Sequence, residues 1–188
     1  MLKDQKPALI LIDLQKGWDD TAHWGGNRNN PHAEKKAVEL LKTWRQAGLP
    51  VFHVIHSSRE AGSRLHPDHP GFAMIDEIVP AENEPVIIKE VNSAFIGTDL
   101  KERLEAENIN TLVIAGLTTN HCVSTTTRMA GNFGFQVYLI ADATATFDRK
   151  GLNGEIFPAE LVHQTALASL HDEFAQVIDS ETVAHMLS

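Results

Sequence analysis

The sequence predicts an α/β fold in which a parallel β-sheet is covered by helices on both faces. Short β-branched runs alternate along the chain with longer stretches of helical period. Each short run is nearly continuously apolar, as expected for a strand that is buried on both sides. The expected strands cover residues 8–13, 51–56, 86–89, 111–116, 136–141 and 175–179.

Helices are expected between these strands and after them. Pro31 and Pro158 are suited to the first turn of a helix, and Gly48 and Gly134 are suited to ending one. Thr98-Asp99 can cap a shorter helix between the third and fourth strands. The expected helices cover residues 31–48, 98–107, 118–133 and 158–172.

Two stretches do not fit the alternation of strands and helices. Residues 57–85 are rich in His, Pro and Gly, and residues 143–157 carry Gly151 and Gly154. Long loops within a compact domain are usually functional. We therefore expect both stretches to form walls of a binding site.

Composition limits the class of protein and its partners. The chain of 188 residues fits one domain over residues 1–188, which is long enough to bury roughly 70% of its unfolded surface. A net charge of -9 with scattered Lys and Arg argues against nucleic acid and favours a small-molecule substrate. The single cysteine and the absence of a signal-like start predict a cytoplasmic protein. No apolar run approaches the roughly 20 residues that a membrane helix needs, so no membrane partner is expected.

Three chemically different groups stand where predicted strands end. Asp13 closes the first apolar run, Lys89 closes the third, and Cys122 follows the run over residues 111–116. If these runs are neighbouring parallel strands, their carboxyl ends lie at one edge of the sheet. The sequence therefore predicts that a carboxylate, an ammonium and a thiol meet in one crevice.

These groups match the requirements of thiol-based acyl transfer. A free cysteine with a pKa of about 8.5 is mostly protonated at neutral pH, so a helix start and Lys89 are expected to favour the thiolate of Cys122. Asp13 can accept the thiol proton and return it to a leaving amine while Lys89 holds the carboxylate. Each residue alone has a simpler interpretation, namely a buried inert thiol, a helix cap or metal ligand, and a solvated lysine. Their joint placement favours catalysis.

Several segments resemble the isochorismatase-like cysteine hydrolases. Residues 13–18, Asp-Leu-Gln-Lys-Gly-Trp, resemble the D-x-Q-x-x-F/W opening of that family. The similarity is strongest in residues 115–123, Ala-Gly-Leu-Thr-Thr-Asn-His-Cys-Val, which contain the specific G-x-x-T-x-x-C element. It also includes Lys89, Ser93-Ala94-Phe95, Asp142-Ala143 and Pro158-Ala159-Glu160, and so covers nearly the whole chain.

The resemblance implies a fold and a reaction. The fold is a three-layer α/β/α arrangement, Rossmann-like, with six mainly parallel strands and a catalytic triad of Asp13, Lys89 and Cys122. A cis peptide is implied at Leu117-Thr118, with an oxyanion hole formed by the N–H groups of Thr118 and Cys122. The implied reaction is hydrolysis of a small amide, imide or ureido C–N bond through an acyl-thioester. Vinyl-ether cleavage by isochorismatase itself needs no thiol, so Cys122 argues against it. A homo-oligomer, at least a dimer, is expected by analogy.

A metal-assisted nicotinamidase is one alternative. Nicotinamidases of the same superfamily hold a divalent metal through a D-x-H motif after the second strand. This chain has His56 at that place, but no D-x-H follows it, and His66 and His69 are the nearest substitutes. Prolines stiffen that loop, so we expect no metal and no other cofactor.

Four further residues are predicted to bind substrate, namely Trp18, His56, Phe95 and Asn120. Trp18 and Phe95 could equally be core or subunit-contact aromatics. His121 lies beside the nucleophile but can point away from it, because adjacent helical residues face different directions. A second alternative is a protein of another class, in which Cys122 is the oxidisable thiol of a redox sensor or binding protein.

Overall fold

The computed structural model describes residues 2–187 and contains a six-stranded sheet in which every neighbouring pair of strands is parallel. The strand order is β3-β2-β1-β4-β5-β8. The strands are β1 (Ala8–Ile12), β2 (Val51–His56), β3 (Val86–Lys89), β4 (Thr111–Leu117), β5 (Gln136–Ala145) and β8 (Gln176–Ile178). The predicted parallel sheet is thus confirmed.

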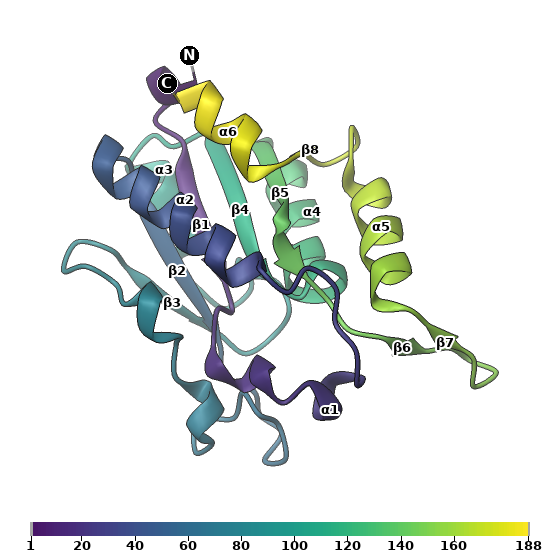
Figure 1. The fold of residues 1–188 in the computed structure, drawn as a ribbon. Coiled ribbons are helices and arrows are strands. Elements are labelled where there is room, and N and C mark those ends of the chain that lie inside the picture. Colours follow the sequence, from purple (N-terminus) through teal and green to yellow (C-terminus); the bar gives the residue numbers. More distant parts are fainter. Residues whose placement is uncertain (1, 188) are drawn as a thin grey trace.

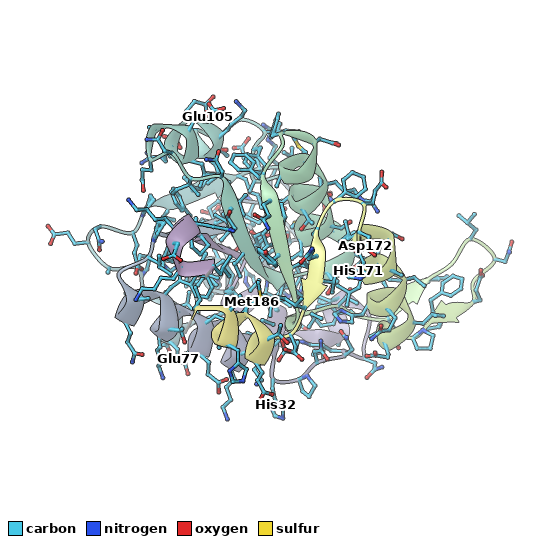
Figure 2. All side chains as sticks on the ribbon, turned by 90° about the horizontal axis from the view of Figure 1, so that it is seen from above. His32, Glu77, Glu105, His171, Asp172 and Met186 are labelled. Carbon is cyan, nitrogen blue, oxygen red and sulfur yellow. The ribbon has the colours of Figure 1, made fainter. Side chains whose placement is uncertain are left out.

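Helices cover both faces of the sheet, which gives three layers (Figure 1). One face is covered by α2 (Ala33–Ala47) and α6 (Ser180–Leu187). The other face is covered by α3 (Leu100–Ala106), α4 (Ser124–Asn132) and α5 (Ala159–Leu170). Figure 2 shows Glu105 of α3 and Met186 of α6 on opposite sides of the sheet.

Alternating residues of the central strands supply the two hydrophobic cores. Leu9 and Leu11 of β1 pack in the cluster that includes α2, whereas Ile10 and Ile12 pack in the cluster that includes α3, α4 and α5. A strand buried on both sides therefore needs apolar residues at every position. This is why the apolar runs predicted the central strands so closely, with β2 at the predicted bounds. The edge strand β3 also has the predicted bounds, although its Val86 and Ile88 are exposed.

The prediction of a loop over residues 143–157 is wrong in part. β5 continues past Asp142 to Ala145, because the Asp142 carboxylate accepts hydrogen bonds from the backbone N–H and hydroxyl of Ser180 and so is tolerated within a strand. Residues further along form an antiparallel hairpin, β6 (Arg149–Lys150) and β7 (Ile156–Phe157). The hairpin extends away from the body of the molecule (Figure 1).

Other differences concern short helices. The helix α1 (Thr21–Trp24) and the C-terminal α6 were not predicted. The predicted helix over residues 118–133 begins as a π-helical turn, Thr119–Val123, before α4 starts.

Residues 57–85 are mostly irregular, as predicted. Short 3-10 turns lie at Leu2–Gln5, Lys16–Asp19, Pro70–Phe72 and Asp76–Ile78. Among the described residues, no helix has the length and apolar character that crossing a bilayer requires.

Candidate active site

Asp13 directly follows β1 in an uncommon backbone conformation. Its φ is 53°, in the left-handed region that few residues with a side chain adopt. Two hydrogen bonds hold it there: its N–H donates to Val54 O at 2.8 Å, and Trp18 Nε1 donates to its carbonyl at 2.6 Å. The side chain is completely buried. Non-glycine residues held in this conformation cluster at functional sites.

Gly116 explains the glycine of the G-x-x-T-x-x-C element. Its φ is 131°, and a Cβ added there would lie 2.0 Å from the carbonyl oxygen of Ile12. Only glycine therefore lets β4 approach β1 closely, one residue before Asp13. The next peptide bond, Leu117-Thr118, is cis, at the position that the resemblance implied. The carbonyl of Thr118 then accepts hydrogen bonds from the N–H groups of His121 and Val123, which closes the turn that carries Cys122.

Lys89 and Asp13 form a buried ion pair. Lys89 Nζ lies 2.7 Å from Asp13 Oδ2, and both side chains are fully buried. Burial would lower the pKa of Lys89, but that pKa is raised, chiefly by the charge of the paired Asp13 carboxylate. The lysine therefore stays an ammonium, and it fixes one oxygen of the Asp13 carboxylate.

His56 is a further partner of the ammonium. Its Nδ1 lies 2.9 Å from Lys89 Nζ, and its pKa is lowered by burial and by the Lys89 charge. A neutral ring with an unprotonated Nδ1 can accept this hydrogen bond. Gln15 holds the backbone of His56 in turn, since its side-chain oxygen accepts from His56 N at 2.9 Å and its amide donates to His56 O at 3.1 Å. These two hydrogen bonds explain the glutamine of the D-x-Q element, because they hold His56 in position.

The thiol completes the cluster. Ligand atoms of Asp13, His56 and Cys122 all lie within 4.8 Å of one another. Within the described part of the chain, Asp13 Oδ1 is buried and has no hydrogen-bond partner. The pKa of Cys122 is raised by burial and by the nearby Asp13 charge, and the lowering effect of Lys89 does not offset them. Lys89 was expected to favour the thiolate, but desolvation of the buried sulfur and the Asp13 charge outweigh its effect, so the pKa is raised and not lowered.

Asn92 is a site residue that sequence analysis missed. The Cys122 thiol points to Asn92 Oδ1 at 3.7 Å. Asn92 is exposed and directly precedes Ser93-Ala94-Phe95, which the family resemblance included. Its position beside that segment was the available signal, but nothing in the residue pattern indicates that its side chain faces the sulfur.

The four residues predicted to bind substrate have different surroundings. Trp18 lines a small cavity of about 60 Å³ beside Thr118, and His56 contacts Lys89. Asn120 accepts a hydrogen bond from the hydroxyl of Thr146, another residue that lines the cavity. Phe95 packs against Phe133 and Phe135, with ring centroids 5.4 and 6.1 Å apart. This packing gives Phe95 a structural contact, and its role in substrate binding stays a prediction.

A second buried network supports the turn before the nucleophile. His163 of α5 is 2% exposed, and its Nδ1 lies 2.9 Å from the hydroxyl of Thr119. Its Nε2 lies 3.4 Å from the amide of Asn30, which also donates to the carbonyls of Ala141 and Thr144. Burial lowers the pKa of His163, which keeps the ring neutral in this network. The helix α5 thereby anchors the turn that positions Cys122.

The residues present do not fit a resident divalent metal. Among the described residues, Asp13, His56 and Cys122 form the one group of three potential ligands that lies close enough together. The ammonium of Lys89 already contacts Asp13 and His56, so a second cation there would be repelled. His66 and His69 do not belong to this group, and each Nδ1 accepts a backbone N–H of its own loop, from Asp68 and Gly71.

Comparison with known proteins identifies the family to which this fold belongs. The Isochorismatase domain matches residues 7–182. The isochorismatase family protein YrdC of Bacillus subtilis is 47% identical over 178 residues, which cover 95% of this chain and 94% of YrdC. The crystal structure of an isochorismatase-family protein from Chromobacterium violaceum superposes with a TM-score of 0.92 at 43% identity, covering 97% of this chain and 94% of the other.

Relatives with a named activity are more distant. Ureidoacrylate amidohydrolase RutB of Klebsiella pneumoniae is 29% identical, over 96% of this chain and 67% of RutB. The structure of N-carbamoylsarcosine amidase from Thermoplasma acidophilum has a TM-score of 0.71 at 25% identity, covering 93% of this chain and 96% of the amidase.

The fold and the site define a doubly wound α/β protein with a buried cluster of carboxylate, ammonium and thiol. The chain belongs to the isochorismatase family, and it is a hydrolase of that family.

Proposed function

We propose that this protein hydrolyses the C–N bond of a small amide, imide or ureido compound through a covalent acyl-thioester on Cys122. The observation that carries the proposal is the Asp13 carboxylate, which lies within 4.8 Å of the Cys122 thiol and has one oxygen paired with Lys89 and one without a hydrogen-bond partner. The names of the ureidoacrylate amidohydrolase, the N-carbamoylsarcosine amidase and a plant relative, Nicotinamidase 3, support this choice of bond.

The first half of the proposed reaction forms the thioester. As the sulfur of Cys122 attacks the substrate carbonyl, Asp13 Oδ1 takes the thiol proton. The negative charge that develops on the carbonyl oxygen is stabilised by the N–H groups of Thr118 and Cys122. When the C–N bond breaks, the leaving nitrogen takes the proton back from Asp13 and departs as a neutral amine or as ammonia.

The second half regenerates the enzyme. Asp13, again a carboxylate, accepts a proton from a water molecule that attacks the thioester carbonyl. The C–S bond then breaks, the acid product leaves, and the sulfur recovers the proton from Asp13. Lys89 holds the other carboxylate oxygen throughout, and His56 fixes the direction of the ammonium.

The raised pKa of Cys122 favours a hydrolase over a redox sensor. Oxidation of cysteine follows thiolate character and exposure, and this sulfur is buried and protonated at rest. A thiol that ionises only as it attacks is suited to catalysis by a neighbouring base.

A panel of small amides, including nicotinamide, carbamoylated amines and ureido acids, tests the proposal by release of ammonia or amine. We expect Cys122→Ala to abolish turnover of every compound that the wild-type protein accepts, while circular dichroism shows an unchanged fold. A Cys122→Ala protein that works at the wild-type rate would refute the thioester route.

A further inference from the structure

A small cavity beside the oxyanion residue Thr118 has one cationic side chain in an otherwise mostly apolar wall. We call it the Arg149 cavity, and it is lined by Trp18, Trp24, Thr118, His121, Thr146, Phe147 and Arg149. Its volume is about 60 Å³, so it suits a group of only a few atoms. Thr118 belongs both to this wall and to the proposed oxyanion hole, so the cavity adjoins the place where the carbonyl of a substrate would lie.

Three aromatic rings form the apolar part of the wall. The ring centroids of Trp18 and Trp24 are 4.4 Å apart, and those of Trp18 and Phe147 are 6.0 Å apart. Both indole N–H groups already donate to backbone carbonyls, to Asp13 O at 2.6 Å and to Gly17 O at 2.7 Å. The tryptophans therefore offer ring surface and no free donor, which suits a short hydrocarbon chain.

Arg149 is the unpaired charge of this cavity. Within residues 2–187, no carboxylate lies within salt-bridge distance of its guanidinium, whereas nearby Arg28 pairs with Glu34 at 2.6 Å. The adjacent Asp148 is engaged elsewhere, since its Oδ1 accepts from Ala159 N and the Asn27 amide. The pKa of His121 is lowered by burial and by the Arg149 charge, so that ring adds a neutral polar group.

We propose that Arg149 binds a carboxylate on the substrate, so that the substrate class is a short amide or ureido acid. A guanidinium pairs with a carboxylate through two parallel hydrogen bonds. The net charge of -9 gives the whole protein no attraction for anions, so an anionic substrate needs a local cation. In this arrangement, the aromatic rings hold the carbon chain, Arg149 holds one end, and the C–N bond at the other end reaches Cys122. The inference rests on the proposed function.

A binding experiment tests this inference without turnover. Propionate and its neutral counterpart propionamide are titrated into the Cys122→Ser protein, and tryptophan fluorescence is recorded because Trp18 and Trp24 line the cavity. We expect saturable quenching by propionate, and we expect Arg149→Gln to weaken its binding at least about tenfold. Lys150→Gln removes the same charge from the neighbouring position of β6, whose side chain points to the other face, and should leave binding unchanged.

A kinetic experiment extends the test to substrates. Arg149→Gln should raise KM for a carbamoylated β-amino acid at least about tenfold and should not change KM for the methylamide of the same compound. The inference is overturned if propionate does not bind the parent protein, if Arg149→Gln binds it as well as the parent does, or if Lys150→Gln causes the same loss. Loss of turnover in Cys122→Ala is independent of all these outcomes, so the two proposals fail separately.

Discussion

Two clusters of ionisable side chains lie along β2. They differ in whether both oxygens of the carboxylate have hydrogen-bond partners. At the carboxyl end of β2, His56 contacts the pair of Lys89 and Asp13 near Cys122. Three residues earlier, His53 contacts Glu84, which also binds Arg45. We call the first the catalytic cluster (Asp13, His56, Lys89 and Cys122) and the second the Glu84 cluster (Arg45, His53 and Glu84).

The carboxylate of the Glu84 cluster is fully used. One oxygen accepts from Arg45 Nε at 2.7 Å, and the other accepts from Arg45 Nη2 at 2.7 Å, His53 Nε2 at 2.7 Å and Ala81 N at 2.9 Å. By contrast, Asp13 keeps one buried oxygen without a hydrogen-bond partner. A saturated buried carboxylate stabilises the fold, whereas an unsaturated one is available to accept a proton.

Cavity size alone would select the wrong cluster. A cavity of about 530 Å³ borders the Glu84 cluster, with Arg45, Glu84 and Pro85 in its wall. The cavity next to the catalytic cluster has about 60 Å³. Hydrogen-bond satisfaction of the carboxylates therefore separates the two regions better than volume does.

The largest effect on activity after loss of Cys122 should come from Asp13→Asn. Removing a general base typically costs about 10²- to 10⁴-fold, and we expect kcat of the folded variant to fall in this range, although Asn no longer pairs with the buried Lys89 ammonium. Glu84→Gln is the matched variant of the other cluster and should leave kcat within about twofold, because it lies away from the reacting atoms. Steady-state kinetics on both proteins provide the measurement, and a fully active Asp13→Asn would remove the distinction between the clusters.

Glu84→Gln should cost stability although it spares activity. Glu84→Gln leaves Arg45 and His53 without a charged partner, and breaking a buried pair of this kind costs about 3–5 kcal/mol of unfolding free energy. Because Arg45 is partly exposed, we expect about 2–4 kcal/mol in urea titrations. Asp99→Asn breaks the exposed pair with Arg103 and should change stability little. Equal losses in the two variants would contradict the assigned role of Glu84.

Lowering the pH from 4.5 toward 2 should reduce the stabilisation that the Glu84 cluster gives to the fold. Burial opposes ionisation of Glu84, but the hydrogen bonds from Arg45, Ala81 and His53 outweigh it and lower its pKa from 4.5 to about 2. A folded pKa below the unfolded value means that the stabilisation is present above pH 4.5 and is lost as the pH falls toward 2. The lowering corresponds to roughly 3 kcal/mol. The difference in melting temperature between wild type and Glu84→Gln should therefore shrink from pH 5 to pH 2.5, and a constant difference would argue against this origin.

The smallest expected effect on kcat concerns the two histidines of β2, which should respond differently to substitution. His56→Ala removes an acceptor of the Lys89 ammonium, so we expect kcat to fall about tenfold, in line with the loss of one hydrogen bond to a charged group. His56→Gln keeps an acceptor and should restore part of that rate. His53→Ala should lower the melting temperature but leave kcat unchanged. If His53→Ala reduced kcat as much as His56→Ala, the two ends of β2 would not be functionally distinct.

The sequence predicted the sheet and the meeting of Asp13, Lys89 and Cys122 because both follow from backbone periodicity. Strands buried on both faces leave continuous apolar runs, and polar residues just after such runs share one edge of the sheet. The cell location, the oligomeric state and the single domain over residues 1–188 stay predictions.

Features that depend on side-chain direction and burial were not predictable in the same way. The contact of Asn92 with the sulfur, the unpaired Arg149 on β6 and the raised pKa of Cys122 all require knowledge of which groups surround a side chain. The hairpin of β6 and β7 was missed because its strands have two residues each, too few to show a period. The helix α6 follows the short strand β8 closely, and its eight residues were not distinguished from the end of the chain.

The proposed mechanism depends most on a covalent bond between substrate and Cys122. The direct measurement is intact-protein mass spectrometry of enzyme that has been mixed with an accepted substrate and quenched in acid during turnover, followed by peptide mapping. We expect a mass increase equal to the acyl group on the peptide that contains Cys122, and no adduct on Cys122→Ala. Turnover that continues in Cys122→Ala, or an adduct on another residue, would contradict the account.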